Sequence, residues 1–154
     1  MRIEGERRFD AKPEDVYDAM TDPEKIGAAF AAIERVEAEG NDWTVVVRPP
    51  FPGGFRLRFS VHLDELREPE HGRLRAWGKS LGGRVSIDSS FDLEPAGGGT
   101  IMRWAADVEA AGLLSGLGSR SLGPVAKLHA DRALDRLTRS LERTPVRRAS
   151  RNIG

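Results

Sequence analysis

The chain has 154 residues, the size of one domain with one hydrophobic core. Its 24 Lys and Arg residues balance 24 Asp and Glu residues, which argues against a dedicated nucleic-acid binder. Since cysteine is absent, disulfides, thiolate metal sites and thiol nucleophiles are excluded. We find no signal-peptide core and no run near the ~20 apolar residues of a membrane span. We therefore expect a cytoplasmic protein, with a peripheral contact at the inner membrane face left open.

The N-terminal part predicts one strand and two short helices. Residues 2–9 alternate between charged side chains and mostly apolar or small ones, as in a strand with one solvated face. Pro13 and the two acids after it indicate a first short helix, because proline suits an early helical position and acids complement the helix dipole. Thr21-Asp22-Pro23 repeats the start signal and predicts a second helix through Phe30.

Residues 33–109 change to a period of two, which indicates strands. Turn-forming residues divide this segment at 39–42, 49–54, 68–72, 82–83 and 96–99. The spacing predicts six strands of an antiparallel meander, each with one buried and one solvated face.

Residues 113–141 return to helical spacing and predict one long amphipathic helix that covers the sheet. Four glycines precede or interrupt its first turns, at 112, 116, 118 and 123. Each lowers helix propensity by about 1 kcal/mol relative to alanine, so this end is expected to be irregular and is a candidate gate. Residues 143–154 contain proline and no acid, and predict a basic, disordered tail after a domain of residues 1–142.

This order of elements resembles the helix-grip fold of the SRPBCC or START-like superfamily. In this α+β fold, a seven-stranded curved antiparallel sheet wraps around a long C-terminal helix, with two short helices after strand one. Within the superfamily, the chain is similar to the carbon monoxide dehydrogenase G-subunit family. The motifs that carry the resemblance are Met1–Glu6 with Asp15-Val16-Tyr17, Gly78-Lys79 with Gly82-Gly83, Gly97–Thr100 leading to Trp104–Val108, and Leu117-Gly118-Ser119-Arg120. The last of these motifs is the most specific.

The chain departs from the family pattern at three places. It has Ala31-Ala32-Ile33 in place of the usual Ile-Pro-Gly turn, Arg7 in place of an apolar residue, and Ala133-Leu134 where bulky aromatics are usual. The resemblance implies a non-catalytic, accessory role in assembly or membrane recruitment of a molybdenum hydroxylase such as carbon monoxide dehydrogenase. It also implies a quinone-like or lipid-like molecule in an internal cavity. From the residues themselves, we expect no cofactor and no metal site.

Small residues on the inner surface predict the same cavity from side-chain volume. The side chains at 76, 78, 106, 126, 130 and 133 are too small to fill the space between sheet and helix as a packed interior requires. The candidate lining comprises Arg7, Phe55, Phe59, Ala76, Ser89, Phe91, Met102, Trp104, Ala126, His129 and Ala133. The alternative interpretation is that the large residues of this set fill an ordinary core.

Few polar residues are candidates for chemistry. His129 lies on the buried stripe of the last helix, either at its flank or in contact with a ligand. Arg7 faces inward on its strand and is expected to pair with an acid, to reach the rim, or to anchor a ligand. Ser89 is interpreted as a small filler, and His62 and His71 as surface residues. No pair of carboxylates is assigned to acid and base roles, so we predict no catalytic residue.

Two segments are candidates for contact with a partner or a membrane. Phe51 stands among prolines in the 49–55 segment, either as part of a stiff hairpin connection or as a docking residue. Leu113, Leu114 and Leu117 are the candidates for the opposite lip. Arginines of the 143–154 tail are further candidates for contact with anionic lipid.

Two other functions remain open from the sequence. One is an enzyme of the polyketide cyclase or hydratase kind, in which Arg7 and His129 polarise a carbonyl and move a proton. The other is a protein-interaction module with a closed core. Fold alone does not decide among these functions, because they differ in their sites.

Overall fold

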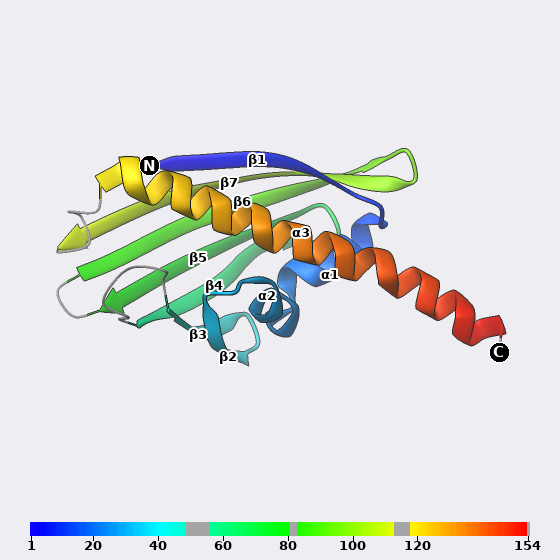
Figure 1. Cartoon of the computed structure of the whole chain (residues 1–154), viewed down its shortest axis with the longest axis horizontal. Coiled ribbons are helices and arrows are strands. Elements are labelled where there is room, and N and C mark those ends of the chain that lie inside the picture. The colour runs from blue at the N-terminus through cyan, green and yellow to red at the C-terminus, as the bar shows by residue number, and fades with distance from the viewer. Residues whose placement is uncertain (49–55, 81–82, 113–117, 154) are drawn as a thin grey trace.

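The structure, a computed structural model, describes residues 1–48, 56–80, 83–112 and 118–153 (Figure 1). Within these residues, the chain forms a seven-stranded antiparallel sheet in the order β1-β7-β6-β5-β4-β3-β2. The strands are β1 (Arg2–Phe9), β2 (Ile33–Glu39), β3 (Asp42–Val47), β4 (Leu57–Arg67), β5 (His71–Ser80), β6 (Gly83–Ala96) and β7 (Gly99–Gly112). The helices are α1 (Pro13–Thr21), α2 (Pro23–Ala29) and α3 (Gly118–Ile153). The predicted α+β architecture is confirmed.

Strands β2 to β7 form a meander, and β1 joins the free edge of β7. The hairpin between β6 and β7 turns at Gly97 and Gly98, whose φ angles are +52° and +82°. A two-residue turn with both φ angles positive matches the twist of the flanking strands and favours glycine. This turn fixes the pairing of β6 and β7, the two longest strands of the sheet.

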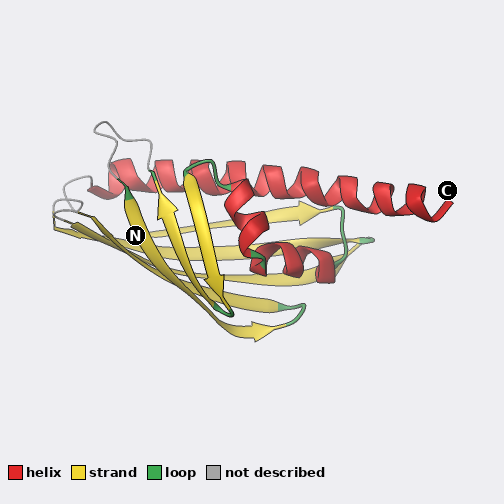
Figure 2. Cartoon of the chain, turned by 90° about the horizontal axis from the view of Figure 1, so that it is seen from below, coloured by secondary structure: helices red, strands yellow, loops and turns green. Residues whose placement is uncertain are grey.

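Helices α1 and α2 begin where the sequence predicts. Pro13 and Pro23 are their first residues. The Asp22 side chain caps α2 by accepting hydrogen bonds from the backbone N–H groups of Glu24 (2.9 Å) and Lys25 (3.3 Å). Both helices contact α3, and together with α3 they lie on the concave side of the curved sheet (Figure 2).

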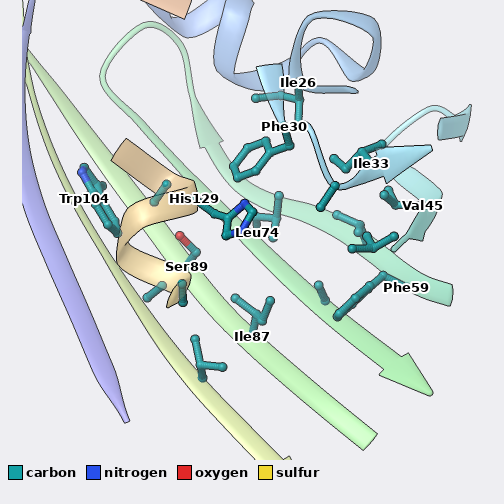
Figure 3. Close-up of a pocket in the computed structure, with 18 of the residues that line it drawn as sticks. Ile26, Phe30, Ile33, Val45, Phe59, Leu74, Ile87, Ser89, Trp104 and His129 are labelled. Atoms are coloured by element: carbon teal, nitrogen blue, oxygen red, sulfur yellow. The ribbon is translucent and has the colours of Figure 1, made fainter. Parts of the chain in front are cut away.

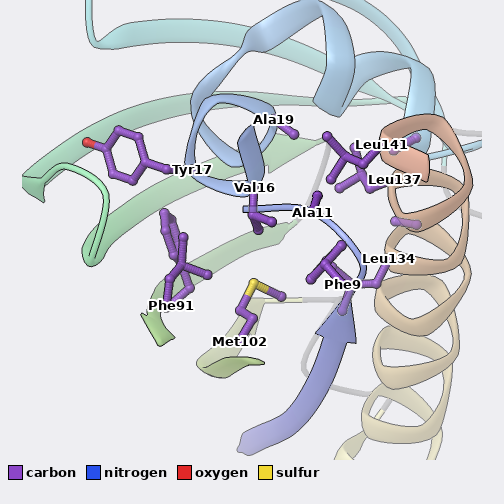
Figure 4. Packing of buried hydrophobic residues seen from close by; sticks show 13 residues of the cluster. Phe9, Ala11, Val16, Tyr17, Ala19, Phe91, Met102, Leu134, Leu137 and Leu141 are labelled. Atoms are coloured by element: carbon purple, nitrogen blue, oxygen red, sulfur yellow. The ribbon is translucent and has the colours of Figure 1, made fainter. Parts of the chain in front are cut away.

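One end of the space between sheet and α3 is filled by a hydrophobic cluster, which we call the closed-end core (Figure 4). Phe9, Val16 and Met102 are completely buried at its centre. The other buried members are Ala11, Tyr17, Ala19, Ala29, Phe91, Leu93, Ala133, Leu134, Leu137 and Leu141. The Tyr17 and Phe91 rings meet edge to face with centroids 6.1 Å apart, an arrangement that aromatic quadrupoles favour. This core secures α3 against the sheet at one end.

Polar contacts also hold α3 in place. The Arg7 guanidinium on β1 forms an ion pair with Asp135 and donates to the backbone carbonyl of Asp131 (3.4 Å). Arg136 donates to the carbonyl of Ala29, at the end of α2 (2.9 Å). The helix is therefore attached to both β1 and α2.

The backbone of α3 continues to Ile153 and projects beyond the sheet (Figure 1). The sequence pattern places the end of this helix near Leu141, so the helix is longer than expected. The division into a domain of residues 1–142 and a separate tail stays a prediction. Within the described residues, no helix combines the length and the apolar character that a membrane span requires.

Candidate functional site: an apolar cavity between the sheet and α3

A cavity of about 410 Å³ lies between the concave face of the sheet and α3 (Figure 3). Its lining comes from all seven strands, from the two short helices and the residues after α2, and from α3 between Val125 and Leu137. Nearly all of the lining side chains are aliphatic or aromatic. A volume of this size lies within the usual range for small-molecule sites, and such sites are mostly apolar.

Aromatic rings of the concave face lie against glycines of neighbouring strands. In the described sheet the pairs are Gly5 with Trp104, Gly72 with Phe91 and Gly78 with Phe59, each directly opposite in the strand register. A Cβ atom at Gly78 or Gly72 would lie 2.6 Å from the opposite phenyl ring, and one at Gly5 would lie 2.8 Å from the indole Nε1. The rings therefore occupy space directly above glycine backbone, which leaves the middle of the cavity open.

Small side chains complete this open space. Ala76 and Ala106 line the cavity from the sheet, and Ala126 and Ala130 line it from α3. A methyl group cannot reach across the gap that the curvature of the sheet creates. Four of the six small residues named from the sequence therefore line the cavity, whereas Gly78 and Ala133 do not.

Most of the residues predicted from the sequence to line a cavity are placed on its surface. These residues are Phe59, Ala76, Ser89, Phe91, Met102, Trp104, Ala126 and His129. Phe55 falls outside the described residues, as do Phe51, Leu113, Leu114 and Leu117, the candidates for partner or membrane contact. Their roles stay predictions.

Two of the residues predicted to line the cavity, Arg7 and Ala133, do not line it. The Arg7 guanidinium is bound to Asp135 at the flank of α3, since an unpaired cation in an apolar interior would be very unfavourable. Its hydrogen bond also lowers the pKa of the Asp135 carboxyl. Ala133 is 1% exposed and belongs to the closed-end core, because its methyl group is covered by other side chains of that cluster.

Sequence reasoning missed the part of the lining that α2, its C-cap residue and the first residue of β2 contribute. Ile26, Phe30 and Ile33 line the cavity there (Figure 3). Ile26 and Phe30 are four residues apart, the spacing that places two side chains on one face of a helix. This spacing, read together with the Asp22-Pro23 start signal, is the signal that could have identified Ile26 and Phe30.

The polar side chains of the described lining are few. Ser89 on β6 donates its hydroxyl proton to the carbonyl of Ala105 (3.1 Å). His129 on α3 directs its imidazole into the cavity (Figure 3) and has no hydrogen-bond partner among the described residues. No Asp, Glu, Lys or Arg is among the described residues that line the cavity. The described lining therefore offers one imidazole and one hydroxyl among otherwise apolar side chains.

The other histidines are paired away from this site. The Nδ1 atoms of His62 and His71 lie 2.7 Å from carboxylate oxygens of Asp42 and Asp92, respectively. Within the ranges that the structure describes, no group of three or more His, Asp or Glu residues is arranged to hold a metal ion.

Comparison with known proteins identifies the relatives of the chain. The family model of the carbon monoxide dehydrogenase G-subunit (CoxG) matches residues 5–142. No match was found among curated proteins. A conserved protein from Geobacillus kaustophilus has a similar structure, with a TM-score of 0.86 at 18% identity, over 94% of this chain and 97% of that one.

A START superfamily protein from Mycobacterium smegmatis is also similar, with a TM-score of 0.71 at 14% identity, over 93% of this chain and 98% of that one. A protein from Chromobacterium violaceum gives a TM-score of 0.71 at 19% identity, over 92% and 96% of the two chains. These similarities establish the START-like helix-grip fold. Because the family model spans most of its length, the chain belongs to the carbon monoxide dehydrogenase G-subunit (CoxG) family.

Proposed function

We propose that this protein binds a lipophilic small molecule, quinone-like or lipid-like, in the cavity between the sheet and α3, without catalysing a reaction on it. We further propose that it serves as an accessory or recruitment factor of a molybdenum hydroxylase such as carbon monoxide dehydrogenase. The observation that carries the binding proposal is the cavity of about 410 Å³ with its apolar lining.

An apolar guest in this cavity would stabilise the folded protein. Atoms that face an unfilled apolar space lose their dispersion partners, which lowers stability. A hydrocarbon guest restores these contacts and removes its own surface from water. The cavity also argues against an interaction module with a closed core.

The chemistry of the lining favours binding over catalysis. General acid–base catalysis usually combines groups with different proton affinities. Here His129 is the one ionisable side chain of the described lining, and Arg7, its partner in the alternative enzymatic hypothesis, is bound to Asp135. A polyketide cyclase or hydratase remains the second candidate because the His129 imidazole faces the cavity. Turnover of cyclisable polyketides by the purified protein would favour it.

The binding proposal is tested by thermal unfolding of the delipidated full chain with lipophilic probes. Suitable probes are decan-1-ol and a benzoquinone with one isoprenyl tail. A ligand at 100 times its Kd stabilises a protein by about 2.7 kcal/mol. For a chain of this size, the expected rise in Tm is roughly 5–10 °C. An unchanged Tm with every probe, up to the solubility limit, would refute the proposal.

The recruitment proposal rests on family membership and needs a separate test. The expected result is that the tagged full chain co-purifies with a molybdenum hydroxylase from its native host. Recovery of that enzyme at no more than the level of an untagged control would contradict recruitment and leave the binding proposal standing.

A further inference from the structure

We propose that His129 is the polar anchor of the cavity, and that it selects neutral lipophiles with a hydroxyl or carbonyl group over lipophiles with a carboxylate. This inference rests on the proposed binding function and specifies the class of ligand. It follows from three features of the site: the position of His129, the state of the nearby cations, and the hydrogen bond of Ser89.

His129 is placed to meet a guest in the cavity. It lies between Ala126 and Ala130 on α3, and these neighbours also line the cavity. Their methyl groups leave the imidazole room to extend toward Leu74 on the opposite sheet (Figure 3). Since His129 has no partner among the described residues, its hydrogen-bonding capacity is available to a ligand.

The cations around the cavity are held outside it. Arg7 binds Asp135 and the carbonyl of Asp131. Lys127 binds the Asp131 carboxylate (3.0 Å) and lies over the Trp104 ring, 5.1 Å from its centroid. Neither cation is among the lining residues. Both positive charges are therefore committed to partners at the flank of α3.

Arg136, also on α3, donates to the carbonyl of Ala29 and is likewise absent from the lining. A carboxylate buried inside this cavity would therefore meet no fixed positive charge in the described lining. Burial of an ionised carboxylate without a cation is very unfavourable. The cavity thus discriminates against fatty acids in their ionised form.

Ser89 complements the imidazole. Because its hydroxyl proton is donated to Ala105, its free lone pairs can only accept a hydrogen bond. A neutral imidazole offers one N–H donor and one nitrogen acceptor. A ligand carbonyl can accept from the His129 N–H, whereas a ligand hydroxyl can either accept from the His129 N–H or donate to its unprotonated nitrogen, and can also donate to Ser89. Neutral oxygen functions therefore match the polar groups of the site.

The test is calorimetric titration of the delipidated full chain at pH 8 with decan-1-ol, decan-2-one and decanoate, which share a ten-carbon chain. Wild type is expected to bind the alcohol and the ketone at least about tenfold more tightly than decanoate. In the His129→Leu variant, affinity for the alcohol and ketone should fall by about tenfold, so the preference over decanoate shrinks. His129→Gln, which keeps a donor and an acceptor, should retain most of the preference.

His62→Leu serves as the control, because it makes the same substitution at a histidine that is paired with Asp42 and does not line the cavity; its preference should equal that of wild type. Thermal unfolding of each variant without ligand confirms that it is folded. An unchanged preference in His129→Leu would overturn the anchor while leaving lipophile binding intact. Equal binding of all three probes by wild type would also overturn the anchor role of His129 and leave lipophile binding intact. If no probe binds wild type, the proposed function and this inference both fail.

Discussion

Glycines on the concave face determine where its aromatic side chains lie. Phe59 and Trp104 are large enough to fill much of the space between sheet and helix. Their rings lie instead against Gly78 and Gly5, where no Cβ competes for the position. An aromatic ring that packs over a glycine of the neighbouring strand is known to stabilise a sheet at that glycine. The same contact preserves the cavity.

Gly78→Ala tests this role. The added Cβ would lie 2.6 Å from the Phe59 ring, so the ring must turn toward the cavity or the strands must separate. Overpacking of this kind costs about 1–3 kcal/mol, and denaturant unfolding should show a loss within that range. Addition of Phe59→Leu, which removes the end of the ring, should recover part of the loss. Stability equal to wild type in Gly78→Ala would show that the contact is not tight.

Individual residues also mark the limit of sequence reasoning. The alternation of β1 correctly places Arg7 on the inner side, but its partner Asp135 lies 128 residues away on α3. Only the final position of the helix brings the two together. Pairing with an acid, reaching the rim and anchoring a ligand are all consistent with the sequence, because the ion pair is a property of the assembled fold.

At the scale of the elements, α3 has different neighbours along its length. Val125, Ala126, His129 and Ala130 face the cavity, whereas Ala133 packs in the closed-end core. Leu134 and Leu137 belong to that core and also line the cavity, so they mark the boundary between the two. Helical spacing predicts the apolar stripe through both parts, but periodicity contains no information on whether the facing space is filled. Only the structure therefore shows at which residues of α3 the cavity ends and the closed-end core begins.

Matched substitutions on α3 test this division. Ala130→Leu extends into the cavity, so Tm should stay equal or rise, since apolar surface becomes buried without overlap. Ala133→Leu adds volume at a residue that is 1% exposed within the closed-end core, so it should destabilise by about 1–3 kcal/mol. Thermal and denaturant unfolding measure both effects. Equal destabilisation by the two substitutions would mean that the space beside Ala130 is not open.

The ion pair between β1 and α3 predicts a dependence on pH. Because Arg7 lowers the pKa of Asp135, the pair stabilises the fold at neutral pH, and this contribution is lost as pH falls through the lowered pKa, below about 4. Asp135→Asn should therefore have a lower Tm than wild type at pH 7, with a difference that shrinks as the Asp135 carboxylate of wild type becomes protonated at acidic pH.

Arg7→Gln provides the matched control for the pair. The double variant should lose less than the sum of the two single variants, because the residues act on each other. A Tm difference between Asp135→Asn and wild type that persists unchanged at low pH would contradict the assignment.

For the whole molecule, local pattern and resemblance predict the architecture, whereas the dimensions of the cavity require the structure. Two-residue alternation and turn signals give the meander, and the bounds of β1 agree residue for residue with residues 2–9. The volume depends on how far the sheet curves and on where the closed-end core meets α3. Both result from packing among residues far apart in the chain, such as Phe9 and Leu137, which no local window contains.

Native mass spectrometry of the purified full chain tests the central claim most directly, because it weighs the protein together with any guest. The account predicts one lipophilic small molecule per chain, released by organic solvent and strongly reduced in Ala130→Leu. It is contradicted if wild type carries no adduct after exposure to decan-1-ol, or if Ala130→Leu retains the same adduct at the same occupancy.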